Sequence, residues 1–196
     1  MEIENIDLTK LTPDVRYLDE MKDVAYDQEW LSSTGNPELY FMYRMLKEKN
    51  GLRYDITVIP AKMLGSEFVK TKGHIHAGPY GEIYVVLEGE GFFLFQKGSG
   101  QKIEDVYAIH GKKGDIIKVP PGYGHVTINP SNKELKMANW VKATDKGNFS
   151  WFEKMRGACY YYTQNGWIKN QNYKNTPELR FEKPLKEVPE DLNFLQ

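Results

Sequence analysis

Two histidines stand one residue apart in TKGHIH, residues 71–76, and they are half of the histidines in the chain. Side chains on an extended strand alternate between its two faces, so His74 and His76 would point the same way. Glu82 follows in GEIYVVLEG, and His125 comes much later in GDIIKVPPGYGHVTIN. Three neutral imidazoles and one carboxylate suit one divalent transition metal such as Fe, Mn, Ni, Co or Zn. This set predicts a metal centre with open coordination positions.

Each of these residues also has an ordinary explanation when it is taken alone. A lone H-x-H is more often a hydrogen-bonded or surface pair than a ligand pair, and a lone Glu82 would be an exposed strand carboxylate. The parity of the neighbouring residues favours a common site. Glu82 and Tyr84 share one face of their expected strand, and His125 and Thr127 share one face of another.

The composition is that of a folded protein without a bulk charge, since Lys plus Arg total 26 and Asp plus Glu total 27 among 196 residues. We therefore expect neither nucleic acid nor a membrane as a partner. No apolar run is long enough to span a bilayer, and the N-terminus MEIENIDLTK lacks the basic start of a secretion signal. The only cysteine, Cys159 in RGACYYY, predicts a packed, unreactive thiol. These features predict a cytoplasmic protein.

Short runs rich in Tyr, Phe, Val, Ile and Thr, separated by turn residues, predict an all-β fold. We expect the main domain over residues 36–172, including a strand over FVKTKGHIH and a late hairpin turning at Asn165-Gly166. Residues 1–35 are expected to be a helical N-terminal extension, with a helix that Thr12 caps and that runs to about Met21. Residues 173–196, which contain three prolines, are expected to be an irregular C-terminal tail.

The spacing of glycines and prolines around these ligands resembles the two motifs of the cupin superfamily. The first segment contains H-x-H, Glu82 and Gly89, and the second reads G-x5-P-x-G-x2-H-x3-N. The residues of the second motif are Gly114, Pro120, Gly122, His125 and Asn129. The resemblance implies a double-stranded β-helix, or jelly-roll, barrel with His125 opposite the first histidine pair and the metal inside.

A narrower resemblance, over roughly residues 13–141, is to the cupin-type phosphoglucose isomerases. The chain carries TKGHIH followed by E-x-Y, and NPELY, ITVIP and VRYLDEM are also similar. Two features depart from that family. Five residues separate His76 from Glu82, one more than the longest usual cupin gap, and Asn148, Phe149 and Trp140 stand near positions where members carry a histidine and tyrosines.

This resemblance implies interconversion of glucose 6-phosphate and fructose 6-phosphate, a step of glycolysis and gluconeogenesis, by a homodimer. It implies that Thr71 and the Gly73 backbone hold the phosphate. Tyr40, Thr57 and Tyr84 would line the sugar pocket beside His125. Strict strand alternation would instead aim Lys72 along the face of His74, and a bulge at Gly73 would re-aim Thr71.

The resemblance also implies that Glu82 is the catalytic base, although a bound cation would weaken its basicity. Either Glu82 detaches when the sugar binds, or a metal-assisted hydride shift replaces proton transfer. Two other functions fit the same residues: a cupin dioxygenase using Fe, and a non-catalytic sugar-binding cupin. His110 in AIHGKKGD is expected on a surface hairpin without a catalytic role.

Overall fold

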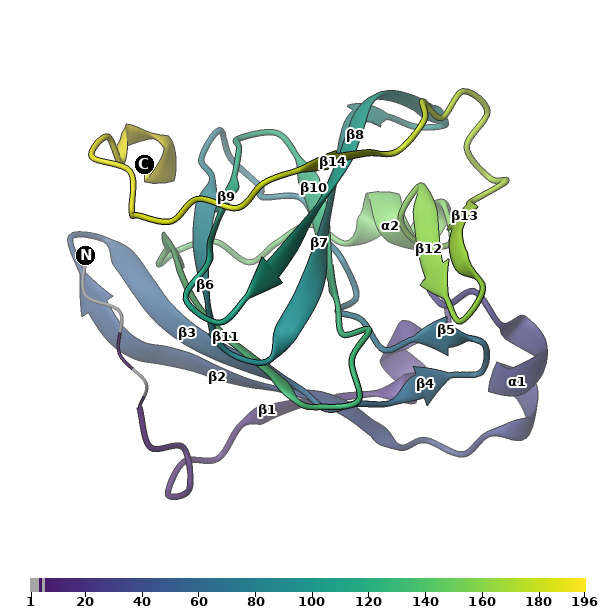
Figure 1. Cartoon of the computed structure of the whole chain (residues 1–196), viewed down its shortest axis with the longest axis horizontal. Helices are drawn as coiled ribbons and strands as arrows, with labels where there is room; N and C mark the ends of the chain where they lie inside the picture. Colours follow the sequence, from purple (N-terminus) through teal and green to yellow (C-terminus); the bar gives the residue numbers. More distant parts are fainter. Residues whose placement is uncertain (1–3, 5) are drawn as a thin grey trace.

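Short strands separated by turns make up most of the chain, which confirms the all-β class (Figure 1). The computed structural model describes residues 4 and 6–196. The largest sheet has six strands in the order β1-β2-β3-β11-β6-β9. Their bounds are β1 Asp14–Tyr17, β2 Glu38–Lys49, β3 Leu52–Ile59, β11 Leu135–Lys142, β6 Glu82–Glu88 and β9 Ile116–Val119.

Two further sheets of four strands complete the described chain, and only β14 among their strands pairs in parallel. The first, in the order β10-β7-β8-β14, comprises β10 Gly124–Ile128, β7 Glu90–Ser99, β8 Lys102–Lys112 and β14 Arg180–Glu182. The other, in the order β13-β12-β5-β4, comprises β13 Gly166–Lys169, β12 Tyr160–Thr163, β5 Glu67–Phe68 and β4 Met63–Leu64. The helical segments are η1 Leu18–Met21, α1 Gln28–Ser33, α2 Ser150–Lys154 and η2 Asn193–Leu195.

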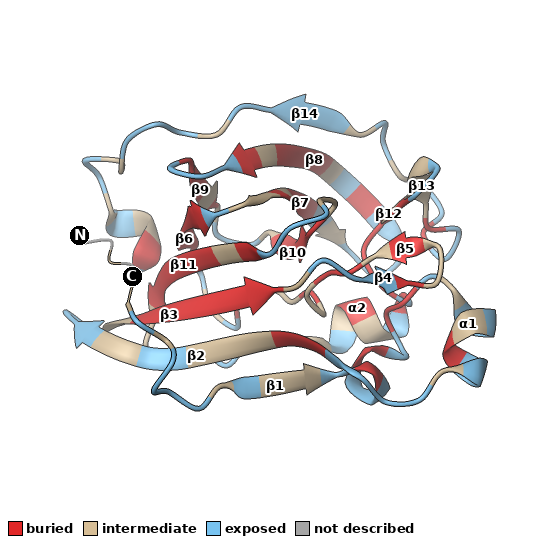
Figure 2. Ribbon diagram, turned by 60° about the horizontal axis from the view of Figure 1, so that its bottom comes forward, coloured by how far each residue is buried: buried red, intermediate tan, exposed pale blue. Residues whose placement is uncertain are grey.

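The six-stranded sheet and the β10-β7-β8-β14 sheet pack face to face around one apolar core, to which β6, β7 and β10 all contribute buried residues (Figure 2). Strand pairing among the described residues keeps these two sheets separate. The expected cupin jelly roll is therefore present as two facing sheets rather than as one hydrogen-bonded closed barrel. None of the described helices has the length and apolarity needed to cross a lipid bilayer.

Because side chains alternate along each strand, the two faces of the six-stranded sheet carry different residues. On the inner face Asn139 lies opposite both Asp55 and Tyr84, so polar residues of three strands meet there. On the outer face Trp140 packs on Tyr54, with ring centroids 5.0 Å apart, within a second apolar cluster that C-terminal residues cover. Trp140 therefore faces away from the interior.

The helix expected from Thr12 to about Met21 is wrong. Residues Asp14–Tyr17 instead form β1, which pairs antiparallel with β2 and places Arg16 opposite Tyr40. Val and Tyr favour extended backbone, and pairing along β2 satisfies the hydrogen bonds of this segment. Among the described residues of the N-terminal extension, helical structure is limited to the single turn η1 and to α1. The boundaries 1–35, 36–172 and 173–196 stay predictions, and residues 1–3 and 5 lie outside the described residues.

The strand expected over FVKTKGHIH is also corrected, since β5 covers only its beginning and isolated bridges follow. Lys70 bridges Ile128 and His74 bridges His125, so four steps along this segment match three steps along β10. The extra residue makes the expected bulge, which Gly73 accommodates with a φ of 81°. A Cβ atom at Gly73 would come within 2.5 Å of the Val126 side chain.

The late hairpin is confirmed, because β12 and β13 pair around Asn165 and Gly166, and Gly166 has a φ of 98°. The tail after residue 172 is mostly irregular, as expected, apart from β14 and η2. Cys159 is fully buried, and this burial raises the pKa of its thiol. Both observations agree with the packed, unreactive thiol expected from the sequence.

A buried ion pair fixes the N-terminal segment to the third sheet. The Lys70 ammonium pairs with the Glu67 carboxylate and also donates to the Val24 carbonyl over 2.8 Å. Glu67 in turn accepts from the Tyr26 backbone N–H over 2.9 Å. Both charged side chains are almost wholly buried, so each depends on the other to offset its lost hydration.

We expect Lys70→Met to lower the free energy of unfolding by about 3–5 kcal/mol, because it leaves the Glu67 charge buried without its cation. Chemical denaturation measures this change. The double variant Glu67→Leu with Lys70→Met is the control and should recover most of the loss, since it removes both charges. A single variant as stable as the wild type would contradict the role of the pair.

Candidate active site

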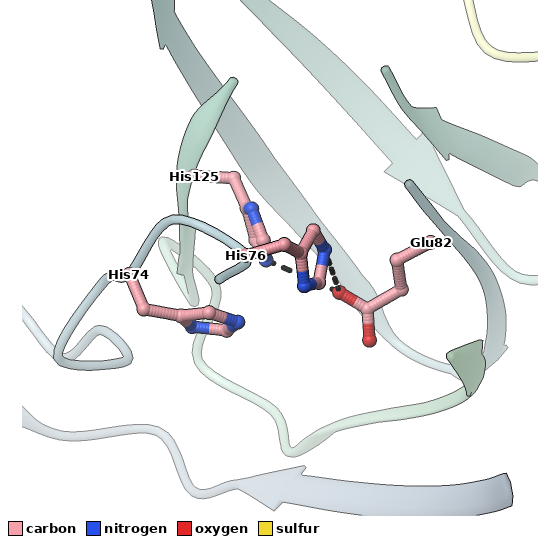
Figure 3. Close-up of side chains that lie close together, drawn as sticks. All are labelled: His74, His76, Glu82 and His125. Atoms are coloured by element: carbon pink, nitrogen blue, oxygen red, sulfur yellow. Dashed lines mark ion pairs between the residues drawn. The ribbon is translucent and has the colours of Figure 1, made fainter. Parts of the chain in front are cut away.

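Three imidazoles and one carboxylate converge between the facing sheets (Figure 3). One potential ligand atom from each of His74, His76, Glu82 and His125 lies within 4.8 Å of the others. The Glu82 Oε2 atom is 3.2 Å from His125 Nε2 and 3.6 Å from His76 Nε2. The rings of His74 and His125 are 4.4 Å apart between centroids. These are the four residues whose spacing in the sequence predicts a metal centre.

The polar atoms of this cluster fit a cation. His76 Nε2 and Glu82 Oε2 are buried without a hydrogen-bond partner among the described residues, which is uncommon for polar atoms in a protein interior. Burial, together with the neighbouring His125 and His76, lowers the pKa of His74 well below its usual value. His74 is therefore neutral at physiological pH and offers a lone pair. A divalent metal would satisfy these donor atoms together.

Asp145 supports the cluster from behind. Its carboxylate oxygen Oδ2 lies 3.0 Å from His76 Nδ1, and Oδ1 accepts from the Tyr80 hydroxyl over 2.9 Å. Burial would raise the pKa of Asp145, but the hydrogen bond and charge of His76 lower it overall. Arg53 donates to the Asp145 carbonyl over 2.6 Å and holds the loop in place. A carboxylate on Nδ1 orients His76 so that Nε2 faces the other ligand residues.

Backbone pairing brings the distant segments together. His74 and His125 exchange both backbone hydrogen bonds, at 3.2 and 2.9 Å, so the histidine pair lies along β10. Ile75 makes the same exchange with Asn148, at 3.1 and 2.8 Å, which attaches the loop after β11. Gly147 in that loop has a φ of 64°, and a Cβ atom there would come within 2.8 Å of the His74 ring.

A cavity opens in front of the cluster, and the other site residues expected from the sequence line it. They are Tyr40, Thr57, Thr71, Gly73 and Tyr84, together with His74, Glu82 and His125. Of the expected residues only His76 does not line the cavity. The bulge at Gly73 brings both Thr71 and Lys72 to the wall, which resolves the conflict between strand alternation and the expected role of Thr71.

Hydrogen bonds hold the wall residues in place. The Thr71 hydroxyl accepts from the Thr127 backbone N–H over 3.0 Å, and the Tyr40 hydroxyl accepts from the Lys72 N–H over 3.2 Å. The Tyr84 hydroxyl lies 3.4 Å from His125 Nε2. Burial and the nearby Glu82 charge raise the pKa of Tyr84 well above its usual value. Tyr84 therefore stays protonated and can donate a hydrogen bond to a ligand.

The sequence reasoning missed Arg16, Asp55, Asn139 and Asp145, all of which line the cavity. Asn139 carried a usable signal, because it is polar among the apolar residues Leu135, Met137 and Val141 that share its face of β11. Asp55 carried none, since the polar residues Arg53 and Thr57 share its face of β3. Asp145 carried none, since TDKG reads as an ordinary turn. Arg16 was missed because its segment was expected to form a helix rather than a strand paired with β2.

His110, which the sequence analysis placed outside the site, lies outside it. His110 is on β8, where its half-exposed ring packs on Phe92 at 4.8 Å and pairs with Glu90 at 3.2 Å. It belongs to neither the cavity wall nor the ligand cluster.

Phe149 does line the cavity, with its ring 5.6 Å from that of His74.

Two facing sheets, antiparallel apart from β14, with three histidines and a glutamate gathered between them, define a cupin-type protein with a candidate metal centre. The model of the glucose-6-phosphate isomerase (GPI) family matches residues 20–178. The chain therefore belongs to the glucose-6-phosphate isomerase family.

Curated relatives include glucose-6-phosphate isomerases of archaea. The protein of Thermococcus litoralis is 36% identical over 125 residues, which cover 61% of this chain and 64% of the relative. That of Pyrococcus furiosus is 36% identical over 121 residues, which cover 59% of this chain and 62% of the relative. The match thus spans less than two thirds of the length of these relatives.

Solved structures that are similar to this chain include an oxalate oxidase in complex with the substrate analogue glycolate. It is 19% identical, with a TM-score of 0.44, over 56% of this chain and 54% of that chain. A cupin-like protein from Thermotoga maritima is 21% identical, with a TM-score of 0.39, over 64% of this chain and 86% of that chain. Neither likeness is close enough to bear on the chemistry of the site.

We expect Asp145→Asn to weaken Co²⁺ binding roughly 10- to 100-fold, because an amide cannot hold His76 in the tautomer that exposes Nε2 as a lone pair. Titration followed by the visible absorption of bound Co²⁺ measures the affinity. Asp105→Asn, which removes a carboxylate at β8 outside the cavity, is the control. Unchanged Co²⁺ affinity in Asp145→Asn would show that Asp145 does not position His76.

Proposed function

We propose that this protein is a metal-dependent isomerase that interconverts glucose 6-phosphate and fructose 6-phosphate. The observation that carries the proposal is the cluster of His74, His76, Glu82 and His125 beside a polar cavity, in a chain of the glucose-6-phosphate isomerase family. The donor set suits Fe, Mn, Ni, Co or Zn. A divalent cation bound by these residues supplies Lewis acidity that polarises the sugar carbonyl and stabilises developing negative charge.

The reaction moves a hydrogen between C1 and C2 of the open-chain sugar, and Glu82 is the carboxylate placed to carry it. Its Oε2 atom is buried, has no hydrogen-bond partner among the described residues and lies 3.2 Å from His125 Nε2. In this proposal Glu82 takes the proton from C2 and returns it to C1 on the same face of the sugar, first as base and then as acid. The hydroxyl proton at O2 passes to O1.

Polar side chains on the inner face of the large sheet would orient the sugar. Thr57, Tyr84 and Asn139 lie on adjacent strands at the cavity wall, and Tyr40 is on β2 beside them. Tyr84 is held as a hydrogen-bond donor by its raised pKa, next to the reacting carboxylate. Fixing C1 and C2 against Glu82 lowers the entropic part of the barrier. Thr71 and the Gly73 backbone would contact the phosphate, and the homodimer stays a prediction.

The direct test is turnover of fructose 6-phosphate by the purified protein, before and after chelation, and after adding back Fe, Mn, Ni, Co or Zn singly. We expect activity to be lost with the chelator and restored by at least one of these metals, since the proposed reaction depends on a bound cation as the Lewis acid. Formation of glucose 6-phosphate is measured by a coupled dehydrogenase assay. Absence of turnover with every metal would refute the proposal, and oxygen consumption would favour a dioxygenase.

We expect Glu82→Gln to lower kcat about 10²- to 10⁴-fold, because the amide cannot accept a proton. The amide oxygen keeps a donor in place, so bound metal is quantified in the same preparations to separate chemistry from metal loss. Solvent deuterium in the product of the wild type would indicate proton transfer through an exchanging carboxylate. Retention of all the substrate hydrogen, with normal turnover in Glu82→Gln, would instead indicate a hydride shift.

A further inference from the structure

The mouth of the cavity carries more positive than negative charge. The cations at its wall, apart from Arg53, are Arg16, Arg44, Lys72 and Lys146. The carboxylates at the wall are already engaged: Asp55 pairs with Arg53 at 2.8 Å, Asp145 holds His76, and Glu82 belongs to the ligand cluster. The positive charge at the mouth is therefore not neutralised from within the cavity, which favours an anionic ligand.

Arg16 and Lys72 are two cations of the cavity wall that lie beside the Phe149 ring. Arg16 enters the cavity face because β1 places it opposite Tyr40, and its guanidinium carbon is 5.9 Å from the Tyr40 ring and 6.0 Å from the Phe149 ring. The Lys72 ammonium lies 5.6 Å from the Phe149 ring. Phe149 in turn contacts His74. Each cation therefore lies beside the aromatic ring that contacts the candidate metal ligand His74.

Both cations are able to exchange their present partners for a ligand. Arg16 pairs with Glu20, and Lys72 pairs with Glu153 at 2.6 Å, but these two glutamates are 44% and 37% exposed and lie outside the cavity wall. The two cations are themselves only 14% and 13% exposed, but solvent at each carboxylate screens the ion pair and weakens it. The Arg16 Nε atom is buried and has no hydrogen-bond partner among the described residues. It is a donor that an oxygen of a bound anion would satisfy.

We propose that Arg16 and Lys72 together anchor the phosphate group of the substrate. This inference rests on the proposed function and extends it to residues outside the set expected from the sequence. Arg16 offers planar, paired donors that match phosphate oxygens, and Lys72 adds a second charge across Phe149. They would act beside the Gly73 N–H, which the family resemblance already assigns to the phosphate and which donates to no backbone carbonyl among the described residues. The N-terminal strand thereby selects phosphorylated over unphosphorylated sugars.

The test compares the wild type, Arg16→Gln, Lys72→Gln and the charge-keeping Arg16→Lys. Each glutamine variant should raise the KM for fructose 6-phosphate and the inhibition constant of inorganic phosphate about 10- to 100-fold, because each loses a charge-assisted hydrogen bond. Metal content should not change, and kcat should fall much less than KM rises. Arg16→Lys should recover part of the loss. Lys112→Gln, which removes an exposed cation on β8, is the matched control.

Thermal unfolding of each variant shows whether it is folded, and calorimetric binding of inorganic phosphate gives a reading that does not need turnover. Equal phosphate affinity and KM in the wild type and both glutamine variants would overturn the inference while leaving the isomerase intact. Phosphate binding that depends on Arg16 and Lys72, in a protein without turnover, would support the anchor and refute the proposed function. If Lys112→Gln weakened phosphate binding and raised KM as much as the two glutamine variants do, the effect would come from net charge alone. That result would also overturn the inference.

Discussion

Burying three imidazoles and a carboxylate side by side is unfavourable unless another group shares their lone pairs, and the structure around the cavity follows from this constraint. Asp145 satisfies one side of His76, while His76 Nε2 and Glu82 Oε2 have no such partner among the described residues. Polar atoms that lose their hydration on burial and gain no hydrogen bond, as these two do, lower the stability of the fold. The same cluster is well suited to a cation, which gains from each donor atom.

Glu82 and His125 stand on the regular strands β6 and β10, whereas His74 and His76 are held by backbone pairing outside any regular strand. The segment with His74 and His76 pairs with β10 on one side and with the loop after β11 on the other. Irregular backbone is usually less precise than a sheet, but here each neighbour of the segment satisfies its N–H and C=O groups. Gly73 and Gly147 permit this close approach, because a side chain would collide with Val126 at Gly73 and with the His74 ring at Gly147.

Charge is divided along the cavity. The deep end holds the carboxylate and imidazoles, and the mouth holds cations whose own partners face the solvent. A ligand with an electron-rich oxygen pair at one end and an anionic group at the other would meet a complementary charge at both. This polarity suits a phosphosugar, and it requires β1, which belongs to the large sheet although it precedes the main run of strands.

Local signals in the sequence predicted the all-β fold class and the four candidate metal-binding residues. The family resemblance, rather than any local pattern, predicted five more residues that line the cavity. Period-two alternation predicts strands, and the glycines and prolines around His125 mark a turn before a strand. Even the bulge at Gly73 was foreseeable from the conflict between Thr71 and Lys72. Only the tertiary structure decided the rest. Pairing with β2 outweighed the helix signal at Thr12, and it brought Arg16 to the cavity. Asp145 reaches His76 across 69 residues of sequence, a contact that no local pattern encodes because it depends on how two loops pack.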